Sequence, residues 1–224
     1  MCGRFFREEV SWEAYHAAVN LVPPLNVDAP EATYNAAPMS VQPVIRWTRE
    51  RSHIELAPCF WGLVPSWWTK PIQERKFSGI NADAETAHER PVYRGAFKYW
   101  RCLVPVSGFY VWVGEGRRKQ PFAVRLKNRE WFCIAGLWDT ALIDGSVLES
   151  FTILTTPPND MMAGLSVRMP MIVEPRKYQR WLNPMSGDAT DMFEPFPAAD
   201  MQAWPIGPDV GNVRNNYPGL IEEA

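Results

Sequence analysis

Few residues in this sequence are of the kinds that build disulfide frameworks or metal sites. The 224 residues include only four cysteines and three histidines, and no two cysteines form a CxxC pair. Structural zinc sites usually draw on cysteine and histidine ligands at such close spacings. We therefore expect no metal and no cofactor, and we expect the three internal cysteines to serve as small core residues.

Long apolar segments and a strong net charge are also absent. The sequence has no run of about 18 apolar residues, which a membrane-spanning helix would need, and no signal sequence precedes Cys2. The expected location is therefore the cytoplasm. The formal net charge is only −2. Because the molecule as a whole does not attract polyanions, any nucleic-acid surface must be a local basic patch.

Apolar and aromatic residues are abundant: 46% of the chain is hydrophobic, and eleven tryptophans and eleven phenylalanines occur. Apolar segments bounded by Gly, Pro and Asp predict strands, and short helical patterns lie outside any strict alternation with them. We therefore predict an α+β fold, with a mostly antiparallel sheet or barrel-like core and short peripheral helices. No repeat or linker divides the chain, so a single domain over residues 1–224 is expected.

The predicted elements follow from these patterns. Hairpins are expected at 114–119 and at Asp144-Gly145, where glycines separate two apolar runs. The predicted strands are Val41–Trp47, Ile54–Val64, Cys102–Val113, Pro121–Leu126, Trp131–Trp138 and Phe151–Thr155. The predicted helices are Ser11–Asn20 with Ser11 as its cap, Pro91–Trp100, Asn159–Leu165 and Pro175–Leu182.

The second residue has a chemistry that no internal cysteine shares. Once Met1 is removed, as a small second residue permits, Cys2 carries a free α-amine and a thiol on adjacent carbons. The pKa of such an amine is about 8 and that of an unperturbed thiol is about 8.5. This 1,2-aminothiol can condense with an aldehyde through an imine and close to a five-membered thiazolidine. On its placement alone, an inert terminal cysteine is the favoured interpretation of Cys2.

Two further segments carry groups suited to recognition. The amide of Asn35 offers a donor and an acceptor without adding charge, although turn chemistry also explains an asparagine before Ala36-Ala37-Pro38. Trp67 and Trp68 are adjacent, and neighbouring side chains of an extended segment point in opposite directions, so we expect one ring to be exposed. An exposed ring can stack on an unpaired base, whereas a tryptophan covered by its own loop is the structural alternative.

Charged residues gather in two other segments. Asn81, Asp83 and Glu85 share one face if their segment is extended, and a capped helix start is the alternative. Arg168 follows a predicted helix. Its guanidinium could hold a phosphate or pair with a carboxylate such as Glu85, and we favour the ion pair.

Several short motifs occur in order along nearly the whole chain: MCGR, YNAAP, WGLVPSWW, INADAET, RCLVPVSGFY, KQPF, AGLW, TTPPN, RMP, and VGNV with Asn215. With these motifs the sequence resembles the SOS response-associated peptidase (SRAP) family of abasic site processing proteins. Members of that family recognise abasic sites in single-stranded DNA and link to them covalently. The resemblance implies a SRAP-like fold and single-stranded DNA with abasic sites as the partner.

The resemblance implies roles for individual residues. In the family, the aminothiol of the processed cysteine attacks the ring-opened deoxyribose aldehyde, and Cys2 matches that residue. The active-site asparagine corresponds to Asn35, and an arginine that contacts the DNA backbone corresponds to Arg4. The paired tryptophans that wedge against bases beside the lesion correspond to Trp67 and Trp68.

Three positions depart from the family pattern. Asp83 replaces the phosphate-binding arginine of NARxET, which implies weaker DNA binding. Val111 replaces the glutamate of FYEW, and Ser166 replaces the histidine of HxRMP. Neither side chain transfers protons near neutral pH, and losing one general acid or base typically costs about 10²- to 10⁴-fold in rate. We therefore expect an impaired linkage reaction, in which Glu85 or Asp83 is the candidate substitute for proton transfer.

Asn81, Asp83 and Arg168 are expected to join Arg4 on the DNA-binding surface. Two other functions stay open at this point. One is a single-stranded DNA-binding module without chemistry, and the other is a peptidase or amidohydrolase in which Cys2 attacks an amide with its own amine as base. We expect a monomer without a membrane partner, associated with the nucleoid in the cytoplasm.

Overall fold

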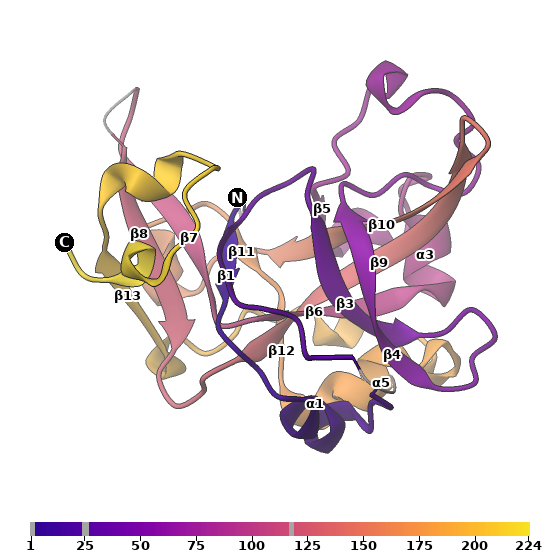
Figure 1. Cartoon of the computed structure of the whole chain (residues 1–224), viewed down its shortest axis with the longest axis horizontal. Helices are drawn as coiled ribbons and strands as arrows, with labels where there is room; N and C mark the ends of the chain where they lie inside the picture. Colours follow the sequence, from indigo (N-terminus) through magenta and orange to yellow (C-terminus); the bar gives the residue numbers. More distant parts are fainter. Residues whose placement is uncertain (1–2, 24–26, 117–118) are drawn as a thin grey trace.

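The computed structural model describes residues 3–23, 27–116 and 119–224, and these residues form two β-sheets (Figure 1). The smaller sheet has the strand order β13-β8-β7-β1-β2, and its neighbouring strands are antiparallel. Its strands are β1 (Phe5–Arg7), β2 (Thr33–Ala36), β7 (Gly108–Val113), β8 (Gln120–Leu126) and β13 (Met201–Pro205).

The larger sheet closes on itself. Strand β10 pairs with β4 on one edge and with β9 on the other, so β4, β3, β6, β9 and β10 form a barrel. The pairings of β10 with β4 and β5 are parallel, and the others are antiparallel. Its strands are β3 (Val41–Trp47), β4 (Ile54–Trp61), β5 (Asn81–Asp83), β6 (Arg101–Val106), β9 (Phe132–Ile143), β10 (Ser146–Thr156), β11 (Met169–Pro170) and β12 (Ile172–Val173).

The helices are short and lie outside the barrel (Figure 1). Helix α3 packs against β6 and β9, and α5 packs against β6. The α-helices are α1 (Trp12–Val19), α2 (Ala84–Ala87), α3 (Arg94–Tyr99), α4 (Asp160–Ala163) and α5 (Tyr178–Leu182). The 3₁₀ turns are η1 (Ile72–Glu74), η2 (Pro175–Lys177), η3 (Pro184–Ser186), η4 (Thr190–Met192), η5 (Ala198–Asp200), η6 (Pro208–Gly211) and η7 (Pro218–Ile221).

This architecture confirms the predicted α+β class with its mostly antiparallel, barrel-like core. Strand β3 has the predicted bounds, and Ser11 caps α1 by accepting a hydrogen bond from the Ala14 amide. The β9–β10 hairpin turns at Asp144 and Gly145, whose φ angles of 48° and 78° suit a two-residue turn of the type that favours glycine.

The predicted strand Cys102–Val113 is wrong in one respect, because this run forms two strands in different sheets. Ser107 separates β6 in the barrel from β7 in the smaller sheet. Its amide donates to the Phe6 carbonyl, and its hydroxyl accepts from the Glu8 amide, so the crossing is fixed by β1. The next residue, Gly108, allows a close approach, since a Cβ there would collide with the Phe6 ring.

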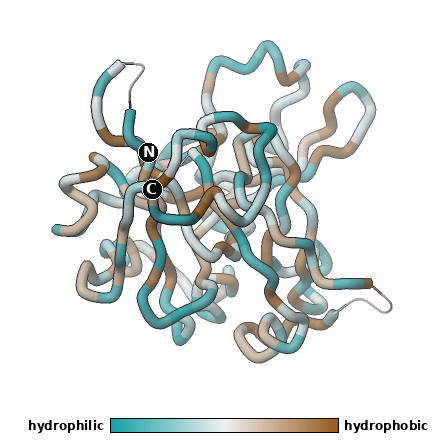
Figure 2. The backbone as a smooth tube through the Cα atoms, turned by 60° about the vertical axis from the view of Figure 1, so that its left-hand side comes forward, coloured by the Kyte–Doolittle hydropathy of each residue, from teal (hydrophilic) through white to brown (hydrophobic). Residues whose placement is uncertain are grey.

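One apolar cluster connects the two sheets. It includes Phe5 of β1, together with Phe109 and Val111 of β7, packed with Trp61 and Phe151 of the barrel. The Phe5 and Trp61 ring centroids lie 5.1 Å apart. Figure 2 shows that many of the peripheral loops around this core are hydrophilic. Strand β1 is therefore part of the contact between the two sheets. A single domain over residues 1–224 remains a prediction.

The described residues contain neither a membrane-spanning helix nor a metal-binding cluster. Among these residues, no helix is long and apolar enough to cross a membrane. Within the same part of the chain, no three His, Cys, Asp or Glu side chains gather where they could hold a metal ion.

Candidate functional site

The first described residues lie beside Val111. Cys2 itself falls outside the described residues, and Gly3 is the residue bonded to it. Strand β1 runs antiparallel to β7 with Phe5 opposite Phe109, and the Tyr110 amide donates to the Arg4 carbonyl at 3.0 Å. Continued by two residues from the Phe5–Phe109 pair, this register places Gly3 opposite Val111. The position that departs from the FYEW pattern is thus a neighbour of the start of the chain.

Arg4 and Asn35 form the polar centre of this region. Arg4 Nη1 donates to Asn35 Oδ1 at 2.6 Å and to the Val210 carbonyl at 2.9 Å. Asn35 Nδ2 donates to the carbonyls of Val210, Asn212 and Asn215 at 3.2, 3.0 and 2.9 Å. The side chains of Arg4 and Asn35 therefore tie β1 and β2 to the segment 210–215 near the end of the chain.

The structure does not support turn chemistry as the reason for Asn35. The residue lies on strand β2, is only 6% exposed, and directs its amide at carbonyl groups that are far away in sequence. The motif containing Val210 and Asn212 marks this contact in the sequence, but nothing in the motif shows that backbone carbonyls are the groups used. Burial lowers the pKa of Arg4, which nevertheless stays charged because arginine titrates far above neutral pH.

We expect Asn35→Ala to lower the free energy of unfolding by about 2 to 4 kcal/mol, because it leaves several buried acceptors and the Arg4 donor without their partner. The measurement is the urea unfolding midpoint. Asn128→Ala is the matched control, since Asn128 is exposed and its loss should change stability by less than about 0.5 kcal/mol. Equal midpoints for the two variants would contradict the structural role assigned to Asn35.

Val111 lies in an apolar setting. Its side chain is 3% exposed and belongs to the cluster that contains Phe5, Phe109 and Met162. Because side chains alternate along a strand, Tyr110 and Trp112 face the other side, where the Arg4 guanidinium lies 6.0 Å from the Trp112 ring centroid. No proton-transfer group therefore comes from position 111.

Arg168 forms the centre of a second polar group. It donates to both carboxylate oxygens of Glu85 at 3.1 and 2.7 Å, and its Nη2 lies 3.4 Å from Asp83 Oδ1. It also donates to the Thr155 carbonyl and hydroxyl. This confirms the predicted ion pair. Two carboxylates surround one guanidinium, so the net charge of the three side chains is −1, and Arg168 is already neutralised.

Asp83 and Glu85 converge on Arg168 from different elements. The extended face predicted for Asn81, Asp83 and Glu85 holds only for the first two, because β5 ends at Asp83 and Glu85 lies in the first turn of α2. Partial burial raises the pKa of Glu85, but hydrogen bonds from Arg168 and the backbone outweigh it and hold that pKa below its ordinary value. Glu85 is therefore ionised at neutral pH and can accept a proton far better than it can donate one.

Ser166 lies just before this group, at the end of the turn that follows α4. Its amide donates to the Met162 carbonyl, and its hydroxyl accepts from the Arg168 amide at 3.4 Å. The indole of Trp61 packs on Phe5 and donates to the carbonyl of Ile80, the residue just before β5, at 2.9 Å. Strand β1 is thus connected through Trp61 to the segment that leads to Asp83.

The tryptophan pair stands apart from both groups, in the loop after β4. Trp67 is 56% exposed, whereas the Trp68 ring packs edge-on against Phe77 at 5.6 Å between centroids. This confirms the expectation that one of the two rings is exposed. Asp139 of β9 fixes this loop by accepting a hydrogen bond from the Ser66 amide at 2.8 Å. Of these two tryptophans, Trp67 is the one whose ring is exposed for stacking.

The other three thiols are protected. Cys59, Cys102 and Cys133 are all buried, and burial raises the pKa of Cys59 and of Cys133 to about 12 and that of Cys102 well above its ordinary value. A thiolate is the reactive form of cysteine, so these three side chains are inert in the folded protein.

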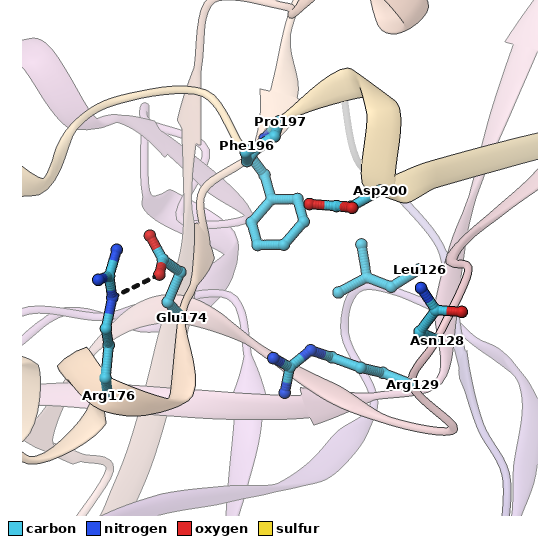
Figure 3. A pocket seen from close by; sticks show the side chains of 8 residues that line it. All are labelled: Leu126, Asn128, Arg129, Glu174, Arg176, Phe196, Pro197 and Asp200. Carbon is cyan, nitrogen blue, oxygen red and sulfur yellow. Dashed lines mark hydrogen bonds and ion pairs between the residues drawn. The ribbon is translucent and has the colours of Figure 1, made fainter.

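Two cavities among the described residues lie away from Arg4, Asn35 and Arg168. One cavity of about 370 Å³ lies between the end of β8 and η5, where Phe196 faces Arg129 and the ion pair of Arg176 with Glu174 closes one side (Figure 3). Arg129 and Asp200 bring opposite charges to it. Another cavity, of about 310 Å³, is lined in part by Trp67.

Comparisons with known proteins identify the family. The family model described as "SOS response associated peptidase (SRAP)" matches residues 1–213. The chain is 32% identical over 235 residues to the abasic site processing protein YoqW of Bacillus subtilis, and 29% identical over 229 residues to the abasic site processing protein YedK of Escherichia coli, with 99% of each chain covered in both cases. The crystal structure of a protein from Bacteroides thetaiotaomicron superposes with a TM-score of 0.77 at 26% identity, covering 97% of this chain and 92% of that one.

Proposed function

Because the chain belongs to the SOS response-associated peptidase family, we propose that it processes abasic sites in single-stranded DNA and links to them through Cys2. The observation that carries the proposal is the family match, which starts at residue 1 and therefore includes Cys2. Relatives matched over 99% of both chains are named abasic site processing proteins. The contacts of Arg4 and Asn35 support it, because they fix the backbone that directly follows Cys2.

The proposed reaction joins an aldehyde to the aminothiol with loss of one water. The α-amine of processed Cys2 attacks C1′ of the ring-opened deoxyribose, and the resulting carbinolamine loses water to give an imine. The thiol then adds to the imine carbon while its proton passes to the nitrogen, which closes the thiazolidine. In the net reaction, the bonds formed to carbon are C–N and C–S, and the bonds broken are the carbonyl C=O, one N–H and the S–H, whose hydrogens leave with the oxygen as water.

The described residues supply positioning more readily than proton transfer. Val111 has no proton that it can transfer, and Glu85 is ionised and accepts hydrogen bonds from Arg168. Opening the sugar ring and expelling water both need a proton donor, so these steps depend on water in this protein. We therefore propose that linkage is slow and that its reversal, which needs the same transfers, is slower still.

DNA affinity in this proposal rests on a few contacts. Arg4 brings a positive charge that attracts phosphate near the start of the chain, and the exposed ring of Trp67 can stack on a base next to the lesion. Asp83 works against binding because its carboxylate would repel a nearby phosphate. The surface around the proposed reaction centre is therefore a weaker anion site than the family pattern implies.

Intact-mass measurement tests the proposal directly. We expect purified protein without Met1 to gain the mass of an abasic oligonucleotide minus one water after prolonged incubation, and the species should survive denaturing electrophoresis. An oligonucleotide of the same sequence without the abasic site is the control and should leave the mass unchanged. Absence of any adduct from protein shown to lack Met1 would refute covalent processing.

A second function is favoured by the apolar setting of Val111. A module that grips abasic or undamaged single strands without chemistry needs Arg4 and Trp67 but no proton donor. This alternative predicts reversible binding that denaturant removes entirely. The same mass experiment therefore separates the two functions, provided that DNA binding is measured alongside it.

A further inference from the structure

Two adjoining cavities lie along helix α3 and are together called the α3 groove. A cavity of about 310 Å³ lies between the Trp67 loop and the start of α3, and a second of about 610 Å³ lies along the rest of the helix. Arg94 and Gly95 line both, so the two cavities meet across the first turn of α3. The groove therefore leads from the exposed ring of Trp67 to Lys98 and Tyr99 at the far end of the helix.

This groove concentrates positive charge in a protein whose net charge is −2. The residues that line it include the cations Arg94, Lys98 and Arg101, of which Arg101 is only 3% exposed, and the carboxylates Asp139 and Asp188. Arg94 and Lys98 are exposed and lie four residues apart on α3, so they share one face. Among the described residues, neither forms an ion pair, whereas Arg168 is neutralised by two carboxylates.

Two further arginines extend the basic surface beside the helix. Arg49 and Arg51 come from the β3–β4 turn, and their guanidinium carbons lie 5.9 and 5.5 Å from the ring centroid of Trp100. Two carboxylates also line the groove, and the exposed one, Asp188, keeps its negative charge beside the cations. Asp139 is buried and accepts from the amides of the Trp67 loop and of Thr140, while Asp188 accepts from Thr190.

Aromatic rings stand at both ends of the groove. Trp67 is 56% exposed at one end, and Tyr99 is 46% exposed at the other, with the Lys98 ammonium 5.0 Å from the Tyr99 ring centroid. Proteins hold single strands without reading their sequence by combining exposed rings, which stack on bases, with cations that follow the phosphates.

We propose that the α3 groove binds the strand of single-stranded DNA that flanks the lesion, with Arg94 and Lys98 on phosphates and Tyr99 against a base. The inference rests on the proposed function for the position of the lesion, but the groove itself binds undamaged strands. It supplies the phosphate contacts that Asp83 and the neutralised Arg168 do not. The groove thus moves the main electrostatic attraction from the start of the chain to α3.

The test uses fluorescence anisotropy with undamaged single strands of about 6 and about 20 nucleotides. R94E/K98E should weaken binding of the long strand by at least 10-fold and should reduce the slope of log affinity against log salt by about 1.4, since each lost contact contributes about 0.7 for a single strand. Tyr99→Ala should weaken it by about 5- to 150-fold if the ring stacks fully on a base. Binding of the short strand should change much less.

K127E/R129E is the matched control, because it makes the same change in net charge at two exposed residues near the cavity of Figure 3. Thermal melts of both double variants establish that each is folded, and R94A/K98A provides a milder second variant. The proposal that the groove binds DNA would be overturned by equal losses of affinity in the two charge-reversed pairs. It would also be overturned by an unchanged salt slope in R94E/K98E and R94A/K98A. A groove effect without an abasic adduct would refute the proposed chemistry alone, and an adduct without a groove effect would refute this inference alone.

Discussion

Cys2→Ala should abolish the denaturant-resistant adduct with abasic DNA and leave the affinity for single strands within about twofold. The variant keeps an α-amine but loses the thiol, so any imine that forms cannot close to a ring and is hydrolysed on denaturation. The expected change in adduct yield is therefore complete. The measurements are denaturing electrophoresis for the adduct and fluorescence anisotropy for binding, made on the same preparations.

Two controls make this result specific to the aminothiol. Cys59→Ala removes a buried thiol whose pKa is raised to about 12 by burial, and it should leave the adduct yield unchanged. Protein that retains Met1 has the Cys2 thiol but no free amine on that residue, and it should also give no adduct. If Cys2→Ala still forms a resistant species, another nucleophile performs the reaction and the proposal for Cys2 is wrong.

The local elements were largely predictable because their signals are local. The apolar run Val41–Trp47 has the bounds of β3, and the hydroxyl of Ser11 caps α1 as the sequence indicates. Strands β1 and β5 were not predicted, since three residues give too short a pattern to distinguish from a loop. Their existence depends on pairing with β7 and β10, which is a property of the fold.

In the candidate site, too, local features were predictable from the sequence and long-range contacts were not. The ion pair between Arg168 and Glu85 could be anticipated from charge alone, because an exposed carboxylate and a guanidinium are natural partners. The contacts of Asn35 could not, since they join residues about 180 positions apart and use backbone carbonyls, which any sequence possesses. The basic face of α3 was not predicted, because only the structure shows that Arg94 and Lys98 border cavities and form no ion pair with another described residue.

Val111→Glu should accelerate adduct formation by about 10²- to 10⁴-fold, the usual contribution of one general acid or base. The register of β1 on β7 places position 111 opposite Gly3, so a carboxyl there lies near the residue that carries the aminothiol. Burial among Phe5 and Phe109 should raise the pKa of the new carboxyl, because the apolar surroundings disfavour the charged form. A carboxyl with a raised pKa keeps more of its proton at neutral pH and can donate it to the departing water.

This substitution has a cost that helps to identify its effect. Placing a carboxyl in the apolar cluster should lower the free energy of unfolding by about 1 to 3 kcal/mol. Because the folded-state pKa is raised, the loss should be smallest at low pH and should grow as the pH rises through that pKa. Val111→Gln is the matched control, since it has nearly the same size and polarity but no proton to transfer. Initial rates of adduct formation for the two variants decide the matter, and a Glu variant no faster than the Gln variant would show that position 111 has no role in proton transfer.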